Sequence, residues 1–283
     1  MRTIIREARR SDKEPLMSFI KDIWGGHDYI PDVWDDWLKD EHGKMFVVEV
    51  DKKPVGMNRV RFLEDGSAWF EGARVHPDFR GKGLASMLGE NSMKFAKESG
   101  VSVFRLTSGS HNRVAHRQIA RIRFSEISRF SVYEPGKGWR SKSAHDVERV
   151  TSDKLPETVR LVEASKEFRL GTGVFWHDFT AAALTPDVIR GLSLEGALWR
   201  AGEAVAVTRE GGEGSGIWEE ICFLGGPVPD ATRLVRALVG RNRRASERWV
   251  FLPQGSPLIH VLRIEGFERN FSMILFERRA TND

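Results

Sequence analysis

Short runs of apolar residues, several of them alternating with polar ones, divide the first half of the chain into expected β-strands. The expected strands are Thr3–Ala8, Met45–Val50, Lys53–Phe62, Ala68–Val75, Val101–Leu106 and Phe124–Tyr133. Between them, apolar residues recur at intervals of three and four, which predicts helices. The first expected helix has Ser11 as its N-cap and ends near Trp24–Gly26. The others are Asp32–Leu38, Leu84–Phe95 and Asn112–Ile122. This alternation predicts an α/β domain built on a mixed sheet.

The second half of the chain resembles a modified copy of the first. The pentapeptide Ser11–Pro15 (S-D-K-E-P) has a near-duplicate in Ser152–Pro156 (S-D-K-L-P), 141 residues later. Towards the end of each half, Arg121–Phe124 (R-I-R-F) is echoed by Arg263–Phe267 (R-I-E-G-F). Two matches at nearly the same offset, in corresponding positions, indicate an internal duplication.

The length of 283 residues is sufficient for two domains. We expect them at residues 1–133 and 146–283, joined by a linker at 134–145 that is rich in glycine, serine and charged residues. The N-terminal residues contain no long apolar run. We therefore expect no signal peptide, no membrane interaction and a cytoplasmic location.

Charge and cysteine content narrow the functional classes. The formal net charge is +4, and the basic residues are scattered except for Arg241–Arg248, which we interpret as a solvated helix end or loop. We therefore expect no nucleic-acid partner. The single cysteine, Cys222, excludes an internal disulfide and lies in an apolar run, which favours a place in the core. The eight histidines do not cluster with cysteine or carboxylates at ligand spacing, so we expect no metal.

One stretch, Val75–Ala85, joins an expected strand to an expected helix and reads V-H-P-D-F-R-G-K-G-L-A. A glycine turn before a helix directs several backbone N–H groups and the positive end of the helix dipole to one point. Gly81 and Gly83 would let a phosphate approach the backbone, and Arg80 and Lys82 add positive charge. The stretch therefore predicts a phosphate or pyrophosphate site. It matches neither the P-loop nor the dinucleotide-binding fingerprint.

The same stretch resembles the acetyl-CoA signature of the GNAT superfamily of N-acetyltransferases, Q/R-x-x-G-x-G/A. Arg80, Gly83 and Ala85 stand at its three fixed places. The resemblance implies a GNAT fold, with acetyl-CoA as the co-substrate. The residues expected to bind it are Val75, His76, Pro77, Arg80, Gly81, Lys82, Gly83, Leu84, Ala85 and Asn112.

The second half of the chain lacks this signature. The expected strand Ile217–Leu224 is followed by G-G-P-V-P, in which Pro227 and Pro229 cannot donate N–H groups. We therefore expect a degenerate GNAT-like second domain that does not bind acetyl-CoA in the family's manner. Its expected role is to close the substrate cleft of the first domain.

Acetyl transfer to an amine needs a polarised thioester carbonyl and a base that takes a proton from the amine. Val75, at the end of its strand, is our candidate to donate its N–H to the carbonyl. Strand alternation puts Glu71 on the same face as Val75, and apolar surroundings would make a carboxylate there a stronger base. The GNAT resemblance also implies a glutamate base in this strand. The alternative is that Glu71 forms a structural pair with an arginine such as Arg59 or Arg74.

The general acid is harder to assign. Many GNAT members carry N-x-x-A-x-x-L-Y-x-x-x-G-F, and Asn112, Ala115 and Phe124 match this pattern. Ile119 and Arg123 stand at the tyrosine and glycine places, so the usual acid is absent. The resemblance implies that Asn112 contacts the pantetheine arm or the thiol. The remaining candidates for the acid are Tyr29, Ser110, His111 and solvent.

The segment Gly25–Pro31 is our candidate for the wall of the acceptor site, because the loop between the first two helices borders the acceptor in this family. Asp28 would hold an ammonium group, and Tyr29 would stack on a ring or donate a hydrogen bond. The alternative makes Asp28 a helix N-cap and Tyr29 a core residue.

The motifs G-G-H-D-Y-I-P at Gly25–Pro31 and E-G-A-R-V-H-P at Glu71–Pro77 also resemble the vertebrate histidine N-acetyltransferases. This resemblance implies acetylation of a free amino acid or a similar small amine, and we expect a monomer or a homodimer. Two alternatives stay open. One is a protein or peptide N-acetyltransferase, and the other is a non-catalytic acyl-CoA sensor, which the missing tyrosine favours.

Overall fold

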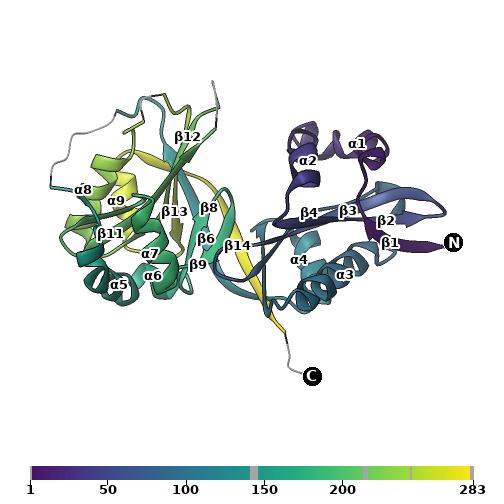
Figure 1. Cartoon of the computed structure of the whole chain (residues 1–283). Coiled ribbons are helices and arrows are strands. Elements are labelled where there is room, and N and C mark those ends of the chain that lie inside the picture. Colours follow the sequence, from purple (N-terminus) through teal and green to yellow (C-terminus); the bar gives the residue numbers. More distant parts are fainter. Residues whose placement is uncertain (1, 141–145, 213–215, 243, 281–283) are drawn as a thin grey trace. The chain divides into compact units, whose positions relative to one another are not determined.

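The computed structural model describes residues 2–140, 146–212, 216–242 and 244–280. The chain forms two compact units (Figure 1). Unit 1 comprises Met1–Leu106, Asn112–Ser125 and Phe276–Asp283, and unit 2 comprises Thr107–His111 and Glu126–Leu275. Both units combine helices with parallel and antiparallel strands, which confirms the expected α/β class with a mixed sheet.

The sheet of unit 1 begins with four antiparallel strands in chain order: β1 (Thr3–Glu7), β2 (Gly43–Val50), β3 (Lys53–Phe62) and β4 (Ala68–Val75). The next strand, β5 (Val103–Gly109), runs parallel to β4. Their ladder joins only Ala68 with Phe104 and Trp69 with Arg105. Beyond Trp69, the second half of β4 is therefore paired on one edge, by β3 alone.

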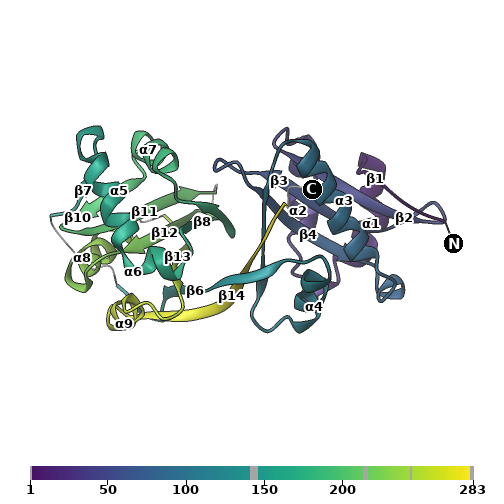
Figure 2. The ribbon, with the colours of Figure 1, turned by 90° about the horizontal axis from the view of Figure 1, so that it is seen from below.

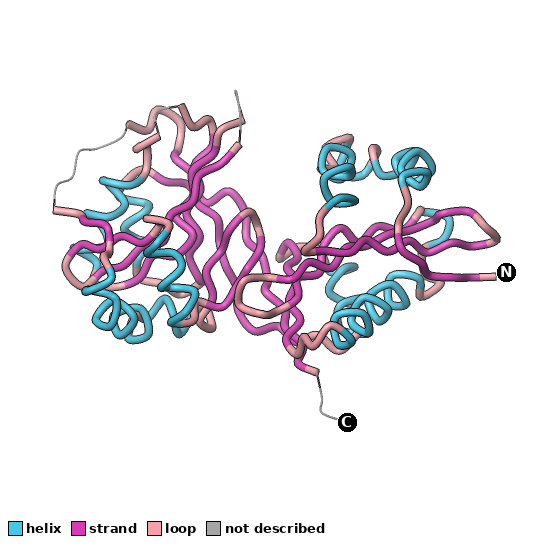
Figure 3. Tube along the Cα trace, in the orientation of Figure 1, coloured by secondary structure: helices cyan, strands magenta, loops and turns pink. Residues whose placement is uncertain are grey.

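Helices cover both faces of this sheet (Figures 1 and 3). The helices α1 (Lys13–Ile20) and α2 (Ile30–Lys39) lie on one face, and α3 (Leu84–Glu98) and α4 (Arg113–Arg121) lie on the other. Under α1 and α2, a buried apolar cluster contains Leu16, Phe19, Ile20, Ile30, Trp34, Met45, Val47 and Met57. Removing this apolar surface from water is what holds α1 and α2 to the sheet.

Unit 2 has the strand order β6-β13-β12-β11-β10-β7, with β12 and β13 parallel. These strands are β6 (Ser125–Pro135), β7 (Glu148–Arg149), β10 (Leu198–Ala201), β11 (Ala204–Gly211), β12 (Trp218–Gly225) and β13 (Glu247–Pro253). The helices α5 (Leu155–Ala164) and α7 (Pro186–Leu194) lie on one face, and α8 (Val228–Leu238) and α9 (Leu258–Ile264) on the other (Figure 2). A separate hairpin joins β8 (Val174–His177) to β9 (Thr180–Ala183), and it follows the short helix α6 (Lys166–Leu170).

The last strand of each half of the sequence contributes to the other unit. From Glu126 onward, β6 belongs to unit 2, although the expected boundaries place it in the first domain. The C-terminal strand β14 (Phe267–Arg279) ends in unit 1, where Glu277 accepts a hydrogen bond of 3.0 Å from Arg105. Periodicity identifies such segments as strands but does not say which sheet they join, because any strand with an apolar face can pair with an available edge.

The order of elements in unit 2 parallels that in unit 1. In each half a 3₁₀ turn, at Arg10–Asp12 and at Ser152–Lys154, leads into a helix at the repeated pentapeptide. The tandem GNAT-like arrangement, with a catalytic and a degenerate domain, stays a prediction. The start of the expected linker is packed in unit 2, since Trp139 Nε1 donates to the carbonyl of Glu265. Residues 141–145 of that linker lie outside the described residues.

Arg105, a buried arginine of unit 1, gives a test of what holds the C-terminal strand. Arg105 donates to Asp65 at 2.6 Å and to Glu277, and all three side chains are nearly inaccessible to solvent. Replacing Arg105 with alanine deprives two carboxylates of their arginine, so we expect a loss of about 3–5 kcal/mol in the free energy of unfolding. Urea denaturation measures this loss. The matched control is Arg129→Ala, which removes an exposed pair with Glu126 and should cost no more than about 1 kcal/mol. Equal effects of the two substitutions would contradict the prediction.

Candidate active site

The turn after β4 has the backbone conformation that the glycine pattern predicts. Gly81 and Gly83 have φ angles of +78° and +79°, in the left-handed region, and a Cβ added at either would have open space. Gly83 is the N-cap of α3, and the first turn of that helix contains no acidic side chain. The N–H groups of this turn have no partner within the helix, so they can bind an anion.

The side chains around this turn are held by local contacts. Arg80 Nε donates to the carbonyl of Val75 at 3.2 Å, and Lys82 Nζ lies 4.7 Å from the centre of the Phe79 ring. His76 accepts from the N–H of Asp78. One residue that sequence reasoning missed is Ser86, whose buried hydroxyl finds no hydrogen-bond partner in the described part of the chain. Its position in the first turn of α3, next to the pattern residue Ala85, is the signal that could have found it.

The backbone N–H of Val75 points away from β3. The neighbouring residue, His76, donates its N–H to the carbonyl of Val55 in β3 at 2.8 Å. Successive N–H groups of a strand point to opposite edges, so the N–H of Val75 points to the edge that β5 would occupy. The ladder between β4 and β5 ends at Trp69. This arrangement agrees with the expectation that Val75 can donate to a thioester carbonyl.

A bulge in β4 corrects the expected face of Glu71. The register with β3 shifts between Met57 and Arg59, so that Gly72 and Ala73 stand opposite one residue of β3. Gly72 has φ +66°, and a Cβ there would lie 2.8 Å from the Trp37 ring. As a result, Glu71 faces Arg59 on the side where Arg74 also lies, rather than sharing a face with Val75. Simple alternation was wrong here because a bulge adds one residue to one strand.

Glu71 lies among charged groups rather than in apolar surroundings. Its carboxylate accepts a short hydrogen bond from Arg59 and lies 4.0 Å from Arg61 Nε. Arg59 also donates to Asp40, and its guanidinium lies 4.8 Å from the centre of the Trp37 ring. The alternative of a pair between Glu71 and an arginine is therefore present in the structure. Such a pair fixes the position of the carboxylate.

The loop before α2 places Asp28 and Tyr29 differently. The buried carboxylate of Asp28 accepts from the N–H of Ile30 at 3.1 Å and from Arg74 Nε at 2.6 Å. Tyr29 is 40% exposed, and its ring lies 5.8 Å from that of Trp37 and from the Arg74 guanidinium. Asp28 thus holds Arg74 and accepts from Ile30, but the N-cap of α2 is Tyr29, which is accessible and not a core residue.

The residues of the incomplete family pattern surround α4. Asn112 Oδ1 accepts from the N–H of Ala115 at 3.1 Å and caps this helix. Ile119, at the tyrosine place, is buried, and its aliphatic side chain has no proton to donate. Arg123, at the glycine place, has φ +58°, which explains why the pattern usually has glycine there. Of the other acid candidates, Ser110 and His111 belong to unit 2.

The start of α8 in unit 2 has a proline and an acidic residue, whereas the N-cap of α3 is a glycine. Helix α8 has Pro227 as its N-cap, and Asp230 lies in its first turn. Asp230 accepts from the N–H of Glu203 at 2.9 Å and from Arg233 at 2.7 Å, and these contacts lower the pKa of its carboxyl. A negative charge at this helix start repels an anionic ligand. This observation supports the prediction that the second half does not bind acetyl-CoA in the family's manner.

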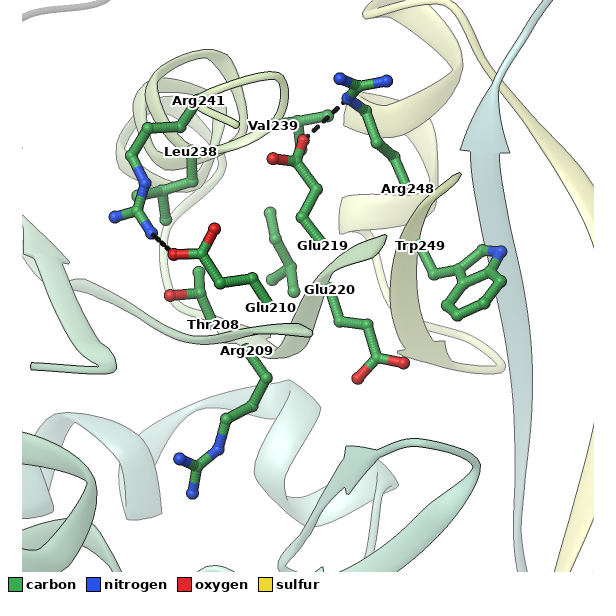
Figure 4. Close-up of a pocket in the computed structure, with 11 residues that line it drawn as sticks. Thr208, Arg209, Glu210, Glu219, Glu220, Leu238, Val239, Arg241, Arg248 and Trp249 are labelled. Atoms are coloured by element: carbon green, nitrogen blue, oxygen red, sulfur yellow. Dashed lines mark hydrogen bonds and ion pairs between the residues drawn. The ribbon is translucent and has the colours of Figure 1, made fainter. Parts of the chain in front are cut away.

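Three further expectations concern the single cysteine, the basic cluster and membrane-spanning helices. Cys222 is buried, and burial raises the pKa of its thiol well above the ordinary value, in line with a core residue. The basic cluster is partly neutralised, because Arg241 pairs with Glu210 and Arg248 with Glu219 beside a pocket of unit 2 (Figure 4). Among the described helices, none combines the length and the apolar character needed to cross a bilayer.

Comparison with known proteins supports the assignment of the first half. Residues 5–122 match the model of the acetyltransferase (GNAT) family. The histidine N-acetyltransferase of Oreochromis niloticus is 34% identical over 82 residues, which cover 29% of this chain and 24% of that protein. The corresponding enzyme of Xenopus tropicalis is 31% identical over 103 residues, covering 35% of this chain and 32% of that protein. The chain thus spans about a quarter to a third of the length of these relatives.

Solved structures match over nearly the whole chain. A GCN5-related N-acetyltransferase of Sphaerobacter thermophilus has a TM-score of 0.64 at 14% identity, covering 99% of this chain and 97% of that one. A GCN5-related glucosamine N-acetyltransferase region of a fungal multi-domain protein has a TM-score of 0.65 at 13% identity, covering 98% of this chain and 38% of that one. At such identities the likeness establishes the fold. Residues 5–122 are thus similar in sequence to the acetyltransferase (GNAT) family, and the chain shares its fold with GCN5-related N-acetyltransferases.

Proposed function

We propose that this protein is an N-acetyltransferase that moves an acetyl group from acetyl-CoA to the amine of a small molecule, for example an amino acid such as histidine. One observation carries the proposal: a single strand, β4, presents the Glu71 carboxylate and the Val75 N–H and then leads into the glycine turn at the start of α3. Base, carbonyl donor and phosphate site thus follow one another along 15 residues of unit 1, from Glu71 to Ala85.

The donor end of the site fits a pyrophosphate. The first turn of α3 offers unpaired N–H groups, Gly81 and Gly83 leave the backbone open, and the orphaned hydroxyl of Ser86 lies in the same turn. Arg80 and Lys82 are close to this turn in sequence and add positive charge. These features support acetyl-CoA as the co-substrate, with the pyrophosphate at α3 and the pantetheine arm along the unpaired edge of β4.

The chemical step is a direct attack. The amine nitrogen attacks the thioester carbonyl carbon while the N–H of Val75 stabilises the negative charge that develops on the carbonyl oxygen. Glu71 accepts the amine proton, directly or through water, because an alkylammonium with a pKa of about 10 is mostly charged at neutral pH. The carbon–sulfur bond then breaks, and the thiolate takes a proton from Tyr29 or from solvent.

The charged neighbours of Glu71 define its role further. Arg59 fixes the position of the Glu71 carboxylate, and Asp40 shares the charge of Arg59 so that the arginine does not fully neutralise the base. At the acceptor side, exposed Tyr29 borders the substrate, and Asp28 contributes by holding Arg74 rather than by direct contact. The local similarity to histidine N-acetyltransferases supports a small amine carrying a charged group as the acceptor.

One observation favours a second candidate function. Ile119 replaces the tyrosine that supplies a proton in many relatives, and this favours a non-catalytic acyl-CoA sensor.

The deciding experiment is CoA release from acetyl-CoA against a panel of amino acids, polyamines and short peptides. We expect fast release with one amino acid or small amine. Release with peptides alone would point to a protein N-acetyltransferase, and binding without release would point to the sensor.

The glycine turn provides a test of donor binding. We expect Gly83→Val to weaken acetyl-CoA binding at least about tenfold, because a side chain at φ +79° strains the backbone by about 1–2 kcal/mol and blocks the approach of the phosphate. Isothermal titration calorimetry measures the affinity. The matched control is Gly66→Val, at φ +76° with equally open surroundings in the turn between β3 and β4, and it should bind acetyl-CoA normally. Normal binding by folded Gly83→Val would remove the central claim.

The base is tested by a substitution that keeps the shape of the side chain. We expect Glu71→Gln to bind acetyl-CoA normally and to lower kcat by about 10²–10⁴-fold at neutral pH. The loss should shrink as pH rises, because more of the amine is then already neutral. The control is Glu98→Gln, an exposed glutamate at the end of α3, which should keep full activity. A pH-independent loss would instead assign Glu71 a purely structural role beside Arg59.

A further inference from the structure

Three side chains of metal-binding type meet in unit 2, away from the residues used above. His177 ends β8, and Glu220 and Cys222 lie two residues apart on β12, whose register with β11 shifts at Cys222. One nitrogen of His177, one oxygen of Glu220 and the sulfur of Cys222 all lie within 4.8 Å of one another. Sequence reasoning missed this group because 43 residues separate His177 from Glu220.

The hydrogen bonding of Glu220 is incomplete. The residue is only 2% exposed, and its Oε1 has no hydrogen-bond partner in the described part of the chain. Its Oε2 accepts from the N–H of Asp178 at 3.2 Å. Arg209, on the adjacent strand β11, forms its ion pair with Glu195. A buried carboxylate oxygen without a hydrogen bond is costly, and a water molecule or a cation would satisfy it.

Glu219 and Glu220 are neighbours on β12, and their side chains point to opposite sides of the strand (Figure 4). Figure 4 shows Glu219 pointing to one side of the strand, where it pairs with Arg248, and Glu220 pointing to the other. On that other side the partners of Glu220 are His177, whose Nδ1 is 3.5 Å from Oε2, and Cys222, whose Sγ is 3.7 Å from Oε2. The Nδ1 of His177 makes no hydrogen bond within the described residues. His177 Nδ1 and Cys222 Sγ therefore both lie beside the Glu220 carboxylate.

The distances between these atoms fit a tetrahedral metal ion. Zinc bonds of about 2.3 Å to sulfur and about 2.0–2.2 Å to nitrogen and oxygen place tetrahedral ligand atoms about 3.4–3.6 Å apart. The separations of 3.5 Å and 3.7 Å are close to these values. Imidazole, carboxylate and thiolate together form a donor set suited to zinc and similar ions rather than to calcium or magnesium.

We propose that His177, Glu220 and Cys222 bind one divalent transition-metal ion of the zinc type, with solvent as the fourth ligand. The imidazole is 44% exposed and gives the ion access from solvent, while the other two ligands are buried. Binding replaces the thiol proton of Cys222, which leaves to solvent, and the two positive charges of the ion balance thiolate and carboxylate. None of these residues belongs to the proposed acetyltransferase site, so the metal site does not depend on that activity.

The site would connect two parts of unit 2 that the main strand ladder does not join. The hairpin β8–β9 forms a two-stranded sheet of its own, and its turn has two successive non-glycine residues, Asp178 and Phe179, at φ +47° and +56°. Such a turn is strained. Phe179 packs on Trp249 and Phe251, and Glu220 holds the turn through the N–H of Asp178. A bound ion would add a bond from the hairpin to β12 and so raise the thermal stability.

Cobalt titration of the full-length protein tests this proposal. After chelator treatment, the protein is titrated with Co²⁺ and then with Zn²⁺. We expect one Co²⁺ per chain, an intense near-ultraviolet band from thiolate-to-cobalt charge transfer, loss of the band when zinc displaces cobalt, and a higher Tm with zinc. Because Cys222 is the single cysteine of the chain, the band reports on this residue alone. Absence of the band, or of one-to-one binding, would overturn the proposal.

Variants distinguish a metal site from a hydrogen-bonded cluster without an ion. We expect His177→Ala to weaken zinc binding by more than the 10–100-fold that loss of an outer-shell partner typically costs. Cys222→Ser should abolish the charge-transfer band. The control, His260→Ala, removes an exposed histidine of α9 and should bind zinc as the wild type does. If His177→Ala bound zinc with wild-type affinity, the ion would lie elsewhere and the assignment would be wrong. The wild-type titration decides the question even if a variant fails to fold.

Discussion

A single glycine in the left-handed conformation, Gly72, determines how β4 presents its side chains. A Cβ at this position would meet the ring of Trp37, so the close packing of α2 on the strand requires glycine there. The resulting bulge adds one residue and brings Arg74 to the face of Glu71. The whole charged face of the candidate site depends on this local irregularity, since without it Arg74 would point to the opposite side of the sheet.

The charged residues on that face form ion pairs, because a buried charge without a partner costs free energy. Arg59 is almost inaccessible to solvent and contacts both Glu71 and Asp40, and Asp28 is fully enclosed against Arg74. Removing either member of such a pair leaves a buried charge without compensation. The same pairing holds Glu71 in place, next to the strand edge at which Val75 is proposed to act. The base role proposed for Glu71 is therefore compatible with its ion pair.

The two halves of the chain show how one element order can carry different chemistry. In unit 1, a glycine turn leaves the start of α3 open for an anion, whereas in unit 2 a proline N-cap and Asp230 occupy the start of α8. In unit 2, His177, Glu220 and Cys222 lie close together, and Oε1 of Glu220 has no hydrogen-bond partner among the described residues. A similar order of elements is compatible with different sites, because the scaffold is held by its core while the site residues are free to change.

The sequence by itself determined the α/β class, nearly all strand and helix positions of the first half, and the glycine turn, because these follow from local periodicity and from backbone preferences of a few adjacent residues. The strand predicted at Ala68–Val75 has the same bounds in the structure. Only the tertiary structure decided the bulge at Gly72, the pairing of Glu71 with Arg59, the unit that each final strand joins and the meeting of His177 with Glu220 and Cys222. Each of these depends on contacts between residues far apart in the chain, and local pattern carries no information about which distant side chains will meet.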